Sequence, residues 1–192
     1  MDTIDKINLI LSFWNYHFIQ NAEEIINTND VDLCSNLFVS LTYYIEAQKR
    51  INGHNHYTLI DTKSYIKEEL LLKSGYRAII KNVNQLTKTN AKQVFTLSLR
   101  DILIHLVSEC STVINFRIEL VLNDCDSDPE WSAVSVSNLI KSTVDIAKEV
   151  NYSLPYNNVQ EYFSRNNYSL TQYKIFEQKR ISESAYYLGE QL

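Results

Sequence analysis

The stretch Leu99–Leu122, LRDILIHLVSECSTVINFRIELVL, sets the fold class of this chain. Its apolar residues recur at steps of three and four, which is the period of a helix that buries one face. The stripe consists of Leu99, Leu103, Leu106, Val107, Cys110, Val113, Ile114, Ile118 and Val121. We therefore expect a helix over part or all of 91–122.

The same period predicts helices along the rest of the chain. The expected spans are 3–27, 30–52, 61–83, 129–152 and, with weaker patterns, 156–165 and 171–188. Gly53 follows Lys49 and Arg50 and is a typical helix stop, whereas Asp128-Pro129 is a typical helix start. Only 3 Gly and 2 Pro occur, too few for a protein rich in tight turns.

These patterns predict an all-α fold, a bundle of about five long helices with a shorter helical C-terminal segment. We expect the bundle over residues 1–155 and a C-terminal helical extension over 156–192, packed on the body or on a partner. A chain of 192 residues is long enough for one sizeable core.

Charge and cysteine usage narrow the class of protein. The net charge of −5 argues against broad, nonspecific nucleic-acid binding but leaves room for a small basic cleft. The three cysteines, Cys34, Cys110 and Cys125, form no CxxC pair and suggest reduced thiols in a cell interior. With an acidic N-terminus and no apolar run of membrane-spanning length, we expect a soluble cytoplasmic protein without a membrane partner.

The candidate functional residues are Arg100, Asp101 and His105, at the start of the quoted stretch. Arginine offers a permanent charge and paired donors that suit a phosphate, and histidine can transfer protons near neutral pH. Ser98 as N-cap and Asp101 at the third helical position resemble a capping box, which would place Arg100 in the first turn. Arg100 and His105 then lie about 140° apart around the helix, so both can reach one cleft without stacking directly.

Asp101, His105 and Glu109 follow one another at steps of four and share a helix face. Asp101 or Glu109 could hold the imidazole in one tautomer and raise its basicity. The plain alternative is a helix start with an ordinary paired histidine.

The other patterns in the sequence give weaker indications of a functional site. Arg50 and His56 form a second loose pair, but it straddles a predicted helix end. His17 lies among aromatic residues and is expected at the edge of the core. His54-Asn55-His56 lacks the further ligands of a zinc site. The alternating acids of 124–128 lack the glycine of a calcium loop and favour a helix-capping loop. We therefore expect no metal and no cofactor.

The hexapeptide Arg100-Asp101-Ile102-Leu103-Ile104-His105 resembles the Arg-x4-6-His signature of HEPN domains, which carry a polar residue directly after the arginine. The resemblance implies an all-α, metal-independent endoribonuclease of a toxin–antitoxin or phage-defence system, with its site at a homodimer interface. It implies that His105 handles protons, Arg100 holds the scissile phosphate and Asp101 organises the pair. RNA is then the substrate, and an antitoxin or regulatory protein is a possible partner.

One position departs from a HEPN subfamily. Toxins paired with a nucleotidyltransferase antitoxin often carry a tyrosine two residues after the histidine, where this chain has Val107. The competing hypothesis is a non-catalytic all-α interaction module: an inactive HEPN-like scaffold, an immunity protein or a viral helical regulator. The acidic charge and the Tyr-rich C-terminal segment favour it.

Overall fold

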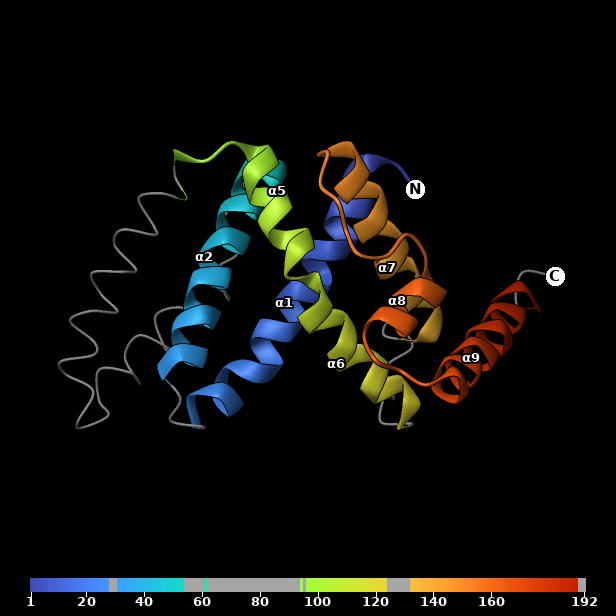
Figure 1. Cartoon of the computed structure of the whole chain (residues 1–192). Coiled ribbons are helices and arrows are strands. Elements are labelled where there is room, and N and C mark those ends of the chain that lie inside the picture. The colour runs from blue at the N-terminus through green and yellow to red at the C-terminus, as the bar shows by residue number, and fades with distance from the viewer. Residues whose placement is uncertain (28–30, 54–60, 62–93, 95, 124–131, 190–192) are drawn as a thin grey trace. The chain divides into compact units, whose positions relative to one another are not determined.

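The computed structural model describes residues 1–27, 31–53, 61, 94, 96–123 and 132–189. Every regular element in these ranges is a helix, which confirms the all-α prediction (Figure 1). The helices are α1 (Thr3–Asn27), α2 (Val31–Asn52), α5 (Leu99–Ser108), α6 (Cys110–Leu122), α7 (Ala133–Glu149), α8 (Val159–Arg165) and α9 (Leu170–Gly189).

The chain divides into two compact units. Unit 1 comprises Met1–Ile10 and Val107–Leu192, and unit 2 comprises Leu11–Leu106. The boundary that we expect after residue 155 stays a prediction.

Aromatic packing holds α1 and α2 together in unit 2. The rings of Trp14 and Phe18 stack with centroids 5.3 Å apart, and Phe18 meets Tyr44 of α2 edge to face at 5.6 Å. His17 lies within this cluster, 6.0 Å from Trp14, and is 7% exposed, as expected for a core histidine. Such rings contribute large apolar areas to a core.

α2 runs antiparallel to α5 in unit 2. Arg50, near the end of α2, donates to the carbonyl oxygens of Leu97 (2.5 Å) and Val94 (3.4 Å), just before α5 begins. Two turns earlier in α2, the ring of Tyr43 meets that of His105, near the end of α5. Gly53 ends α2 as predicted: its φ is +72° and its N–H donates to the carbonyl of Lys49 (2.9 Å).

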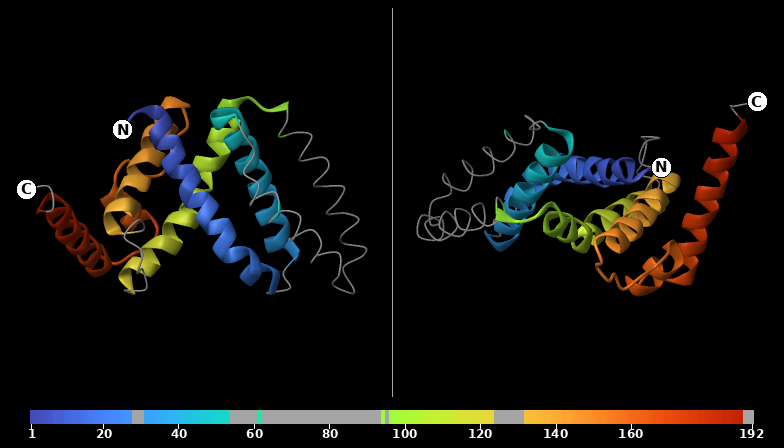
Figure 2. Two further views of the ribbon diagram at one scale, coloured as in Figure 1. Left: turned by 180° about the vertical axis from the view of Figure 1, so that it is seen from behind. Right: turned by 90° about the horizontal axis from the view of Figure 1, so that it is seen from above.

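In unit 1, α7 packs against α6, α8 and α9 (Figures 1 and 2). The Tyr162 hydroxyl donates to Oδ1 of Asn115 (2.7 Å), which joins α8 to α6. The first turn of the chain also belongs to this unit, since Lys6 forms a 2.8 Å ion pair with Asp145 of α7. The Tyr-rich segment after residue 155 therefore packs on the helices of its own chain.

Two helix boundaries differ from the sequence predictions. The stretch 91–122 contains a break at Glu109, where the N–H of Thr112 donates to the carbonyl of Glu109 (3.2 Å) in a tighter turn than an α-helix has. α7 begins at Ala133 with Ser132 as its N-cap, because the Ser132 side chain accepts from the N–H of Ser135. The helix expected over 61–83, apart from residue 61, and the Asp128-Pro129 start lie outside the described residues.

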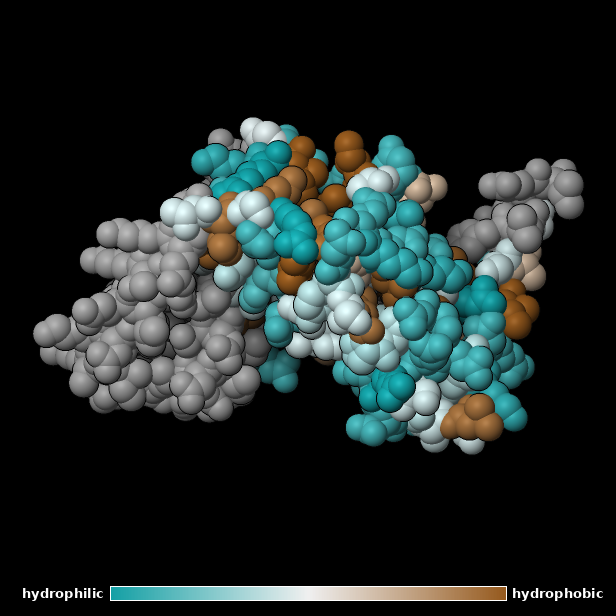
Figure 3. Space-filling model, turned by 45° about the horizontal axis from the view of Figure 1, so that its top comes forward, coloured by the Kyte–Doolittle hydropathy of each residue, from teal (hydrophilic) through white to brown (hydrophobic). Residues whose placement is uncertain are grey.

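On the face that Figure 3 shows, hydrophobic residues interrupt a mainly hydrophilic surface of the described residues in several small areas. The exposed large apolar residues include four on α9: Leu170, Ile175, Ile181 and Tyr186. None of the described helices combines the length and apolarity that a membrane span requires.

Candidate functional site

α5 begins with the capping arrangement that the sequence predicts. The N–H of Asp101 donates to Oγ of Ser98 (3.1 Å), and the Ser98 hydroxyl donates to Oδ2 of Asp101 (2.6 Å). The N–H of Ile102 donates to the carbonyl of Ser98 (3.1 Å). These bonds fix the first turn and place Arg100 at its second position.

Arg100 is open to solvent. Its side chain is 53% exposed, and its Nη1 lies 3.9 Å from Oδ1 of Asp101, which is itself 46% exposed. An ion pair this long and this exposed contributes little free energy. The guanidinium is thus available to an incoming anion, beside first-turn N–H groups that have no partner within the helix.

His105 has different surroundings. It is half-buried, and its ring stacks on that of Tyr43 with centroids 3.7 Å apart and planes inclined by 21°. Its Nε2 atom is buried. For Nε2 to exchange a proton with a substrate, the imidazole has to turn away from this position.

The three predicted site residues therefore lie in two different environments. Arg100 and Asp101 meet each other in the exposed first turn, whereas His105 meets Tyr43 of the neighbouring helix. In an ideal helix, Cα atoms five residues apart are separated by about 7.5 Å along the axis. A polyanion that lies across the start of α5 could span that distance.

Sequence reasoning did not find Tyr43 and Arg50 as neighbours of this site. Both lie in α2, seven residues apart, with the buried Ala47 between them, so all three share one helix face. That spacing was the available signal. The helix that the face meets, α5, lies about fifty residues away along the chain, and spacing alone does not identify it.

The other sequence candidates have structural roles or fall outside the described residues. Arg50 pairs with Glu46 (2.7 Å) and donates to two backbone carbonyls, which gives it a bracing role. His54 and His56 lie outside the described ranges. Within those ranges, no three His, Cys, Asp or Glu side chains gather in a group that could hold a metal ion.

Cys110 is a buried free thiol, as expected for a core cysteine. Burial raises its pKa to about 12, although a contact with the Thr143 hydroxyl (3.5 Å) opposes part of that rise. The thiol is therefore protonated at neutral pH, and a protonated thiol is a poor nucleophile. Cys125 lies outside the described residues.

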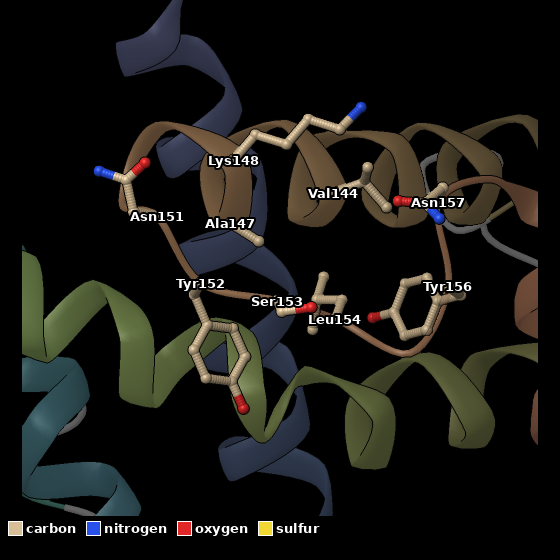
Figure 4. A pocket seen from close by; sticks show the side chains of 9 residues that line it. All are labelled: Val144, Ala147, Lys148, Asn151, Tyr152, Ser153, Leu154, Tyr156 and Asn157. Atoms are coloured by element: carbon tan, nitrogen blue, oxygen red, sulfur yellow. The ribbon is translucent and has the colours of Figure 1, made fainter.

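A groove of about 410 Å³ lies in unit 1, between α7 and the residues 152–157 that return along it (Figure 4). Val144, Ala147 and Leu154 supply its apolar lining. The side chains of Lys148 and Asn151 point away from Tyr156 in this view, so the polar groups do not converge. The groove lacks the focused set of polar groups that a specific ligand site needs.

Comparison of the chain with models of protein families, with curated proteins and with solved structures gives no match. The HEPN resemblance thus rests on the hexapeptide and on the all-α fold.

Proposed function

We propose that this chain is a HEPN-like, metal-independent endoribonuclease that acts in the cytoplasm as part of a toxin–antitoxin or phage-defence system. The observation that supports it best is the exposed guanidinium of Arg100 in the capped first turn of α5, five residues before His105. A phosphate at that position would meet the guanidinium and the positive end of the helix dipole together.

The proposed reaction is an internal transesterification of RNA. The His105 imidazole accepts the proton of a 2′-hydroxyl, and O2′ attacks the adjacent phosphorus. The bond from phosphorus to O5′ breaks, O5′ takes a proton from a water molecule, His105 returns its proton to the solvent, and the products carry a 2′,3′-cyclic phosphate and a 5′-hydroxyl. Arg100 stabilises the extra negative charge on the phosphoryl oxygens, and Asp101, held in the first turn by Ser98, organises the pair.

A homodimer fits this proposal. A lone arginine and a lone histidine make a sparse site, whereas two copies of α5 across a two-fold axis would bring two Arg100 and two His105 side chains to one RNA. An antitoxin or another regulatory protein would be the second partner.

The test is incubation of the purified protein with total RNA in EDTA. We expect cleavage with cyclic-phosphate ends by the wild type and a loss of at least about 100-fold in Arg100→Ala and His105→Ala. Arg165→Ala, which removes an exposed arginine of α8, is the matched control and should retain activity. Full activity in the His105→Ala protein, with circular dichroism showing that it is folded, would refute the assignment.

A second candidate function has its own supporting observation. The buried Nε2 of His105 and its stack on Tyr43 also suit a packing residue in a non-catalytic interaction module. In that case none of the proteins cleaves RNA, His105→Ala lowers stability, and Arg100→Ala changes only the affinity for a protein partner. Thermal melting of the two variants beside the cleavage assay separates the two functions.

A further inference from the structure

We propose that Tyr43 is a positioning residue that holds the His105 imidazole inward, so that the ring must leave this stack before it exchanges a proton with RNA through Nε2. The part that concerns RNA rests on the proposed function. The part that concerns the ring rests on the 3.7 Å stack and the buried Nε2.

The stack is supported by the backbone on both sides. Arg50 fixes the end of α2 to the carbonyls of Val94 and Leu97, and Glu46 holds the Arg50 side chain from within α2. Tyr43 lies seven residues before Arg50, and His105 lies eight residues after Leu97, or about 10 and 12 Å along the two axes. Because α2 and α5 are antiparallel, the rings of Tyr43 and His105 lie at the same level along the two helix axes.

Ring geometry favours the inward position. Planes inclined by only 21°, with centroids 3.7 Å apart, place the imidazole flat against the phenol ring. Each ring thereby shields an apolar face of the other from water. Turning the imidazole outward gives up this contact and exposes the face of Tyr43. The inward state is therefore favoured, by a factor that we set at about five from the usual strength of aromatic pairs.

The first experiment measures access to the imidazole without RNA. Diethylpyrocarbonate acylates an imidazole nitrogen, and mass spectrometry of peptides assigns the rate to His105, with N-acetylhistidine as the freely accessible reference. We expect His105 to react more slowly than the reference, about five-fold faster in Tyr43→Leu, and at the wild-type rate in Tyr43→Phe, which retains the stack. Equal rates in the wild type and Tyr43→Leu would overturn the proposal.

A measurement on the wild type alone covers the case in which Tyr43→Leu does not fold. The ring current of a stacked tyrosine moves the imidazole carbon-bound protons of His105 upfield in the proton NMR spectrum. We expect that upfield displacement in the wild type and in Tyr43→Phe. Random-coil shifts for these protons would overturn the proposal.

The RNA arm separates this proposal from the proposed function. If His105 is held inward, Tyr43→Leu should cleave RNA faster than the wild type in single-turnover assays, again by about five-fold. Cleavage that depends on His105 but is unchanged in Tyr43→Leu refutes the positioning role and leaves the nuclease intact. A rise in acylation with no cleavage by any protein refutes the nuclease and leaves the stack intact.

Discussion

The Ser98 hydroxyl has a larger effect than its exposed position suggests. It accepts from the N–H of Asp101 and donates to the Asp101 carboxylate, so one small side chain fixes the start of α5. Asp101 is thereby tied to the helix end as well as to Arg100. The polar residue after the arginine thus has a structural role that is independent of any chemistry.

Ser98→Ala should lower the free energy of unfolding by about 1 kcal/mol, because the N–H of Asp101 loses its acceptor. Urea denaturation followed by circular dichroism measures the change. Ser182→Ala, at an exposed position on α9, is the control and should stay within about 0.5 kcal/mol of the wild type. Equal stability of the two variants would show that the Ser98 cap does not hold α5.

Cys110 lowers the stability of the folded protein at alkaline pH. Its pKa is about 12 in the folded chain, against an ordinary value of 9.0, since burial disfavours the thiolate. Below about pH 9 the thiol is protonated in both states and costs nothing. Above that pH the Cys110 thiol loses its proton in the unfolded chain first. The free energy of unfolding therefore falls progressively as the pH rises towards the folded pKa.

We expect this one group to lower the free energy of unfolding by about 1.4 kcal/mol per pH unit in that range. Urea titrations of the wild type and Cys110→Ala at about pH 8 and pH 10 test it. The variant should lose less stability than the wild type between the two conditions. The buried Tyr44, whose pKa is raised to about 12, acts in the same direction in both proteins. Parallel losses would refute the role of Cys110.

At the scale of elements, α9 caps two other helices. The Glu183 carboxylate accepts from the N–H groups of Ala133 and Val134 (3.3 and 3.0 Å), the first two residues of α7. One turn earlier, Lys179 donates to the carbonyl of Val121 (2.5 Å), in the last turn of α6. A negative charge thus meets the positive end of α7, and a positive charge meets the negative end of α6.

Glu183→Ala should cost about 1 to 2 kcal/mol of unfolding free energy, because two N–H groups lose their acceptor and the helix dipole loses its counter-charge. Glu183→Gln keeps an acceptor oxygen and should cost less. Urea denaturation measures both, with Gln178→Ala on the exposed side of α9 as the control. If Glu183→Ala matches that control, the capping contact carries no stability.

The predictability of these elements depends on where their partners lie. Gly53 and Ser98 act on residues within five positions of themselves, so the sequence sufficed to predict the end of α2 and the start of α5. The start of α7 has a local N-cap, Ser132, but the acceptor for its first two N–H groups is Glu183, fifty residues away, which no local pattern indicates. Likewise, the motif predicted that Arg100 lies in a first turn, but the ring that covers His105 comes from a different helix.

At the scale of the whole molecule, charge limits how the proposed RNA substrate can bind. The chain carries 23 acidic and 18 basic residues, for a net charge of −5. The net charge offers no general attraction to a polyanion, so under the proposed function RNA has to be bound by a few local cations such as Arg100. Such a mode of binding differs from that of nucleic-acid-binding proteins with a broad basic surface.

A weak salt dependence of RNA binding follows. Each phosphate contact to a single strand contributes about −0.7 to the slope of log affinity against log salt, so a site with one or two arginines gives a slope of about −1. Fluorescence anisotropy with a labelled oligoribonucleotide and His105→Ala protein measures this without cleavage. A slope steeper than about −4 would indicate a broad basic surface and contradict this prediction.

Unit 1 joins the first ten residues to the second half of the chain. The Thr3 hydroxyl donates to Oε1 of Glu149 across 146 positions of sequence, and Lys6 pairs with Asp145. On a ribosome, the first turn of α1 must wait for α7 to be synthesised, and α6 and α7 must wait for their caps on α9. Contacts this distant slow folding. Any activity that needs an intact unit 1 consequently arises only after α9 has been synthesised.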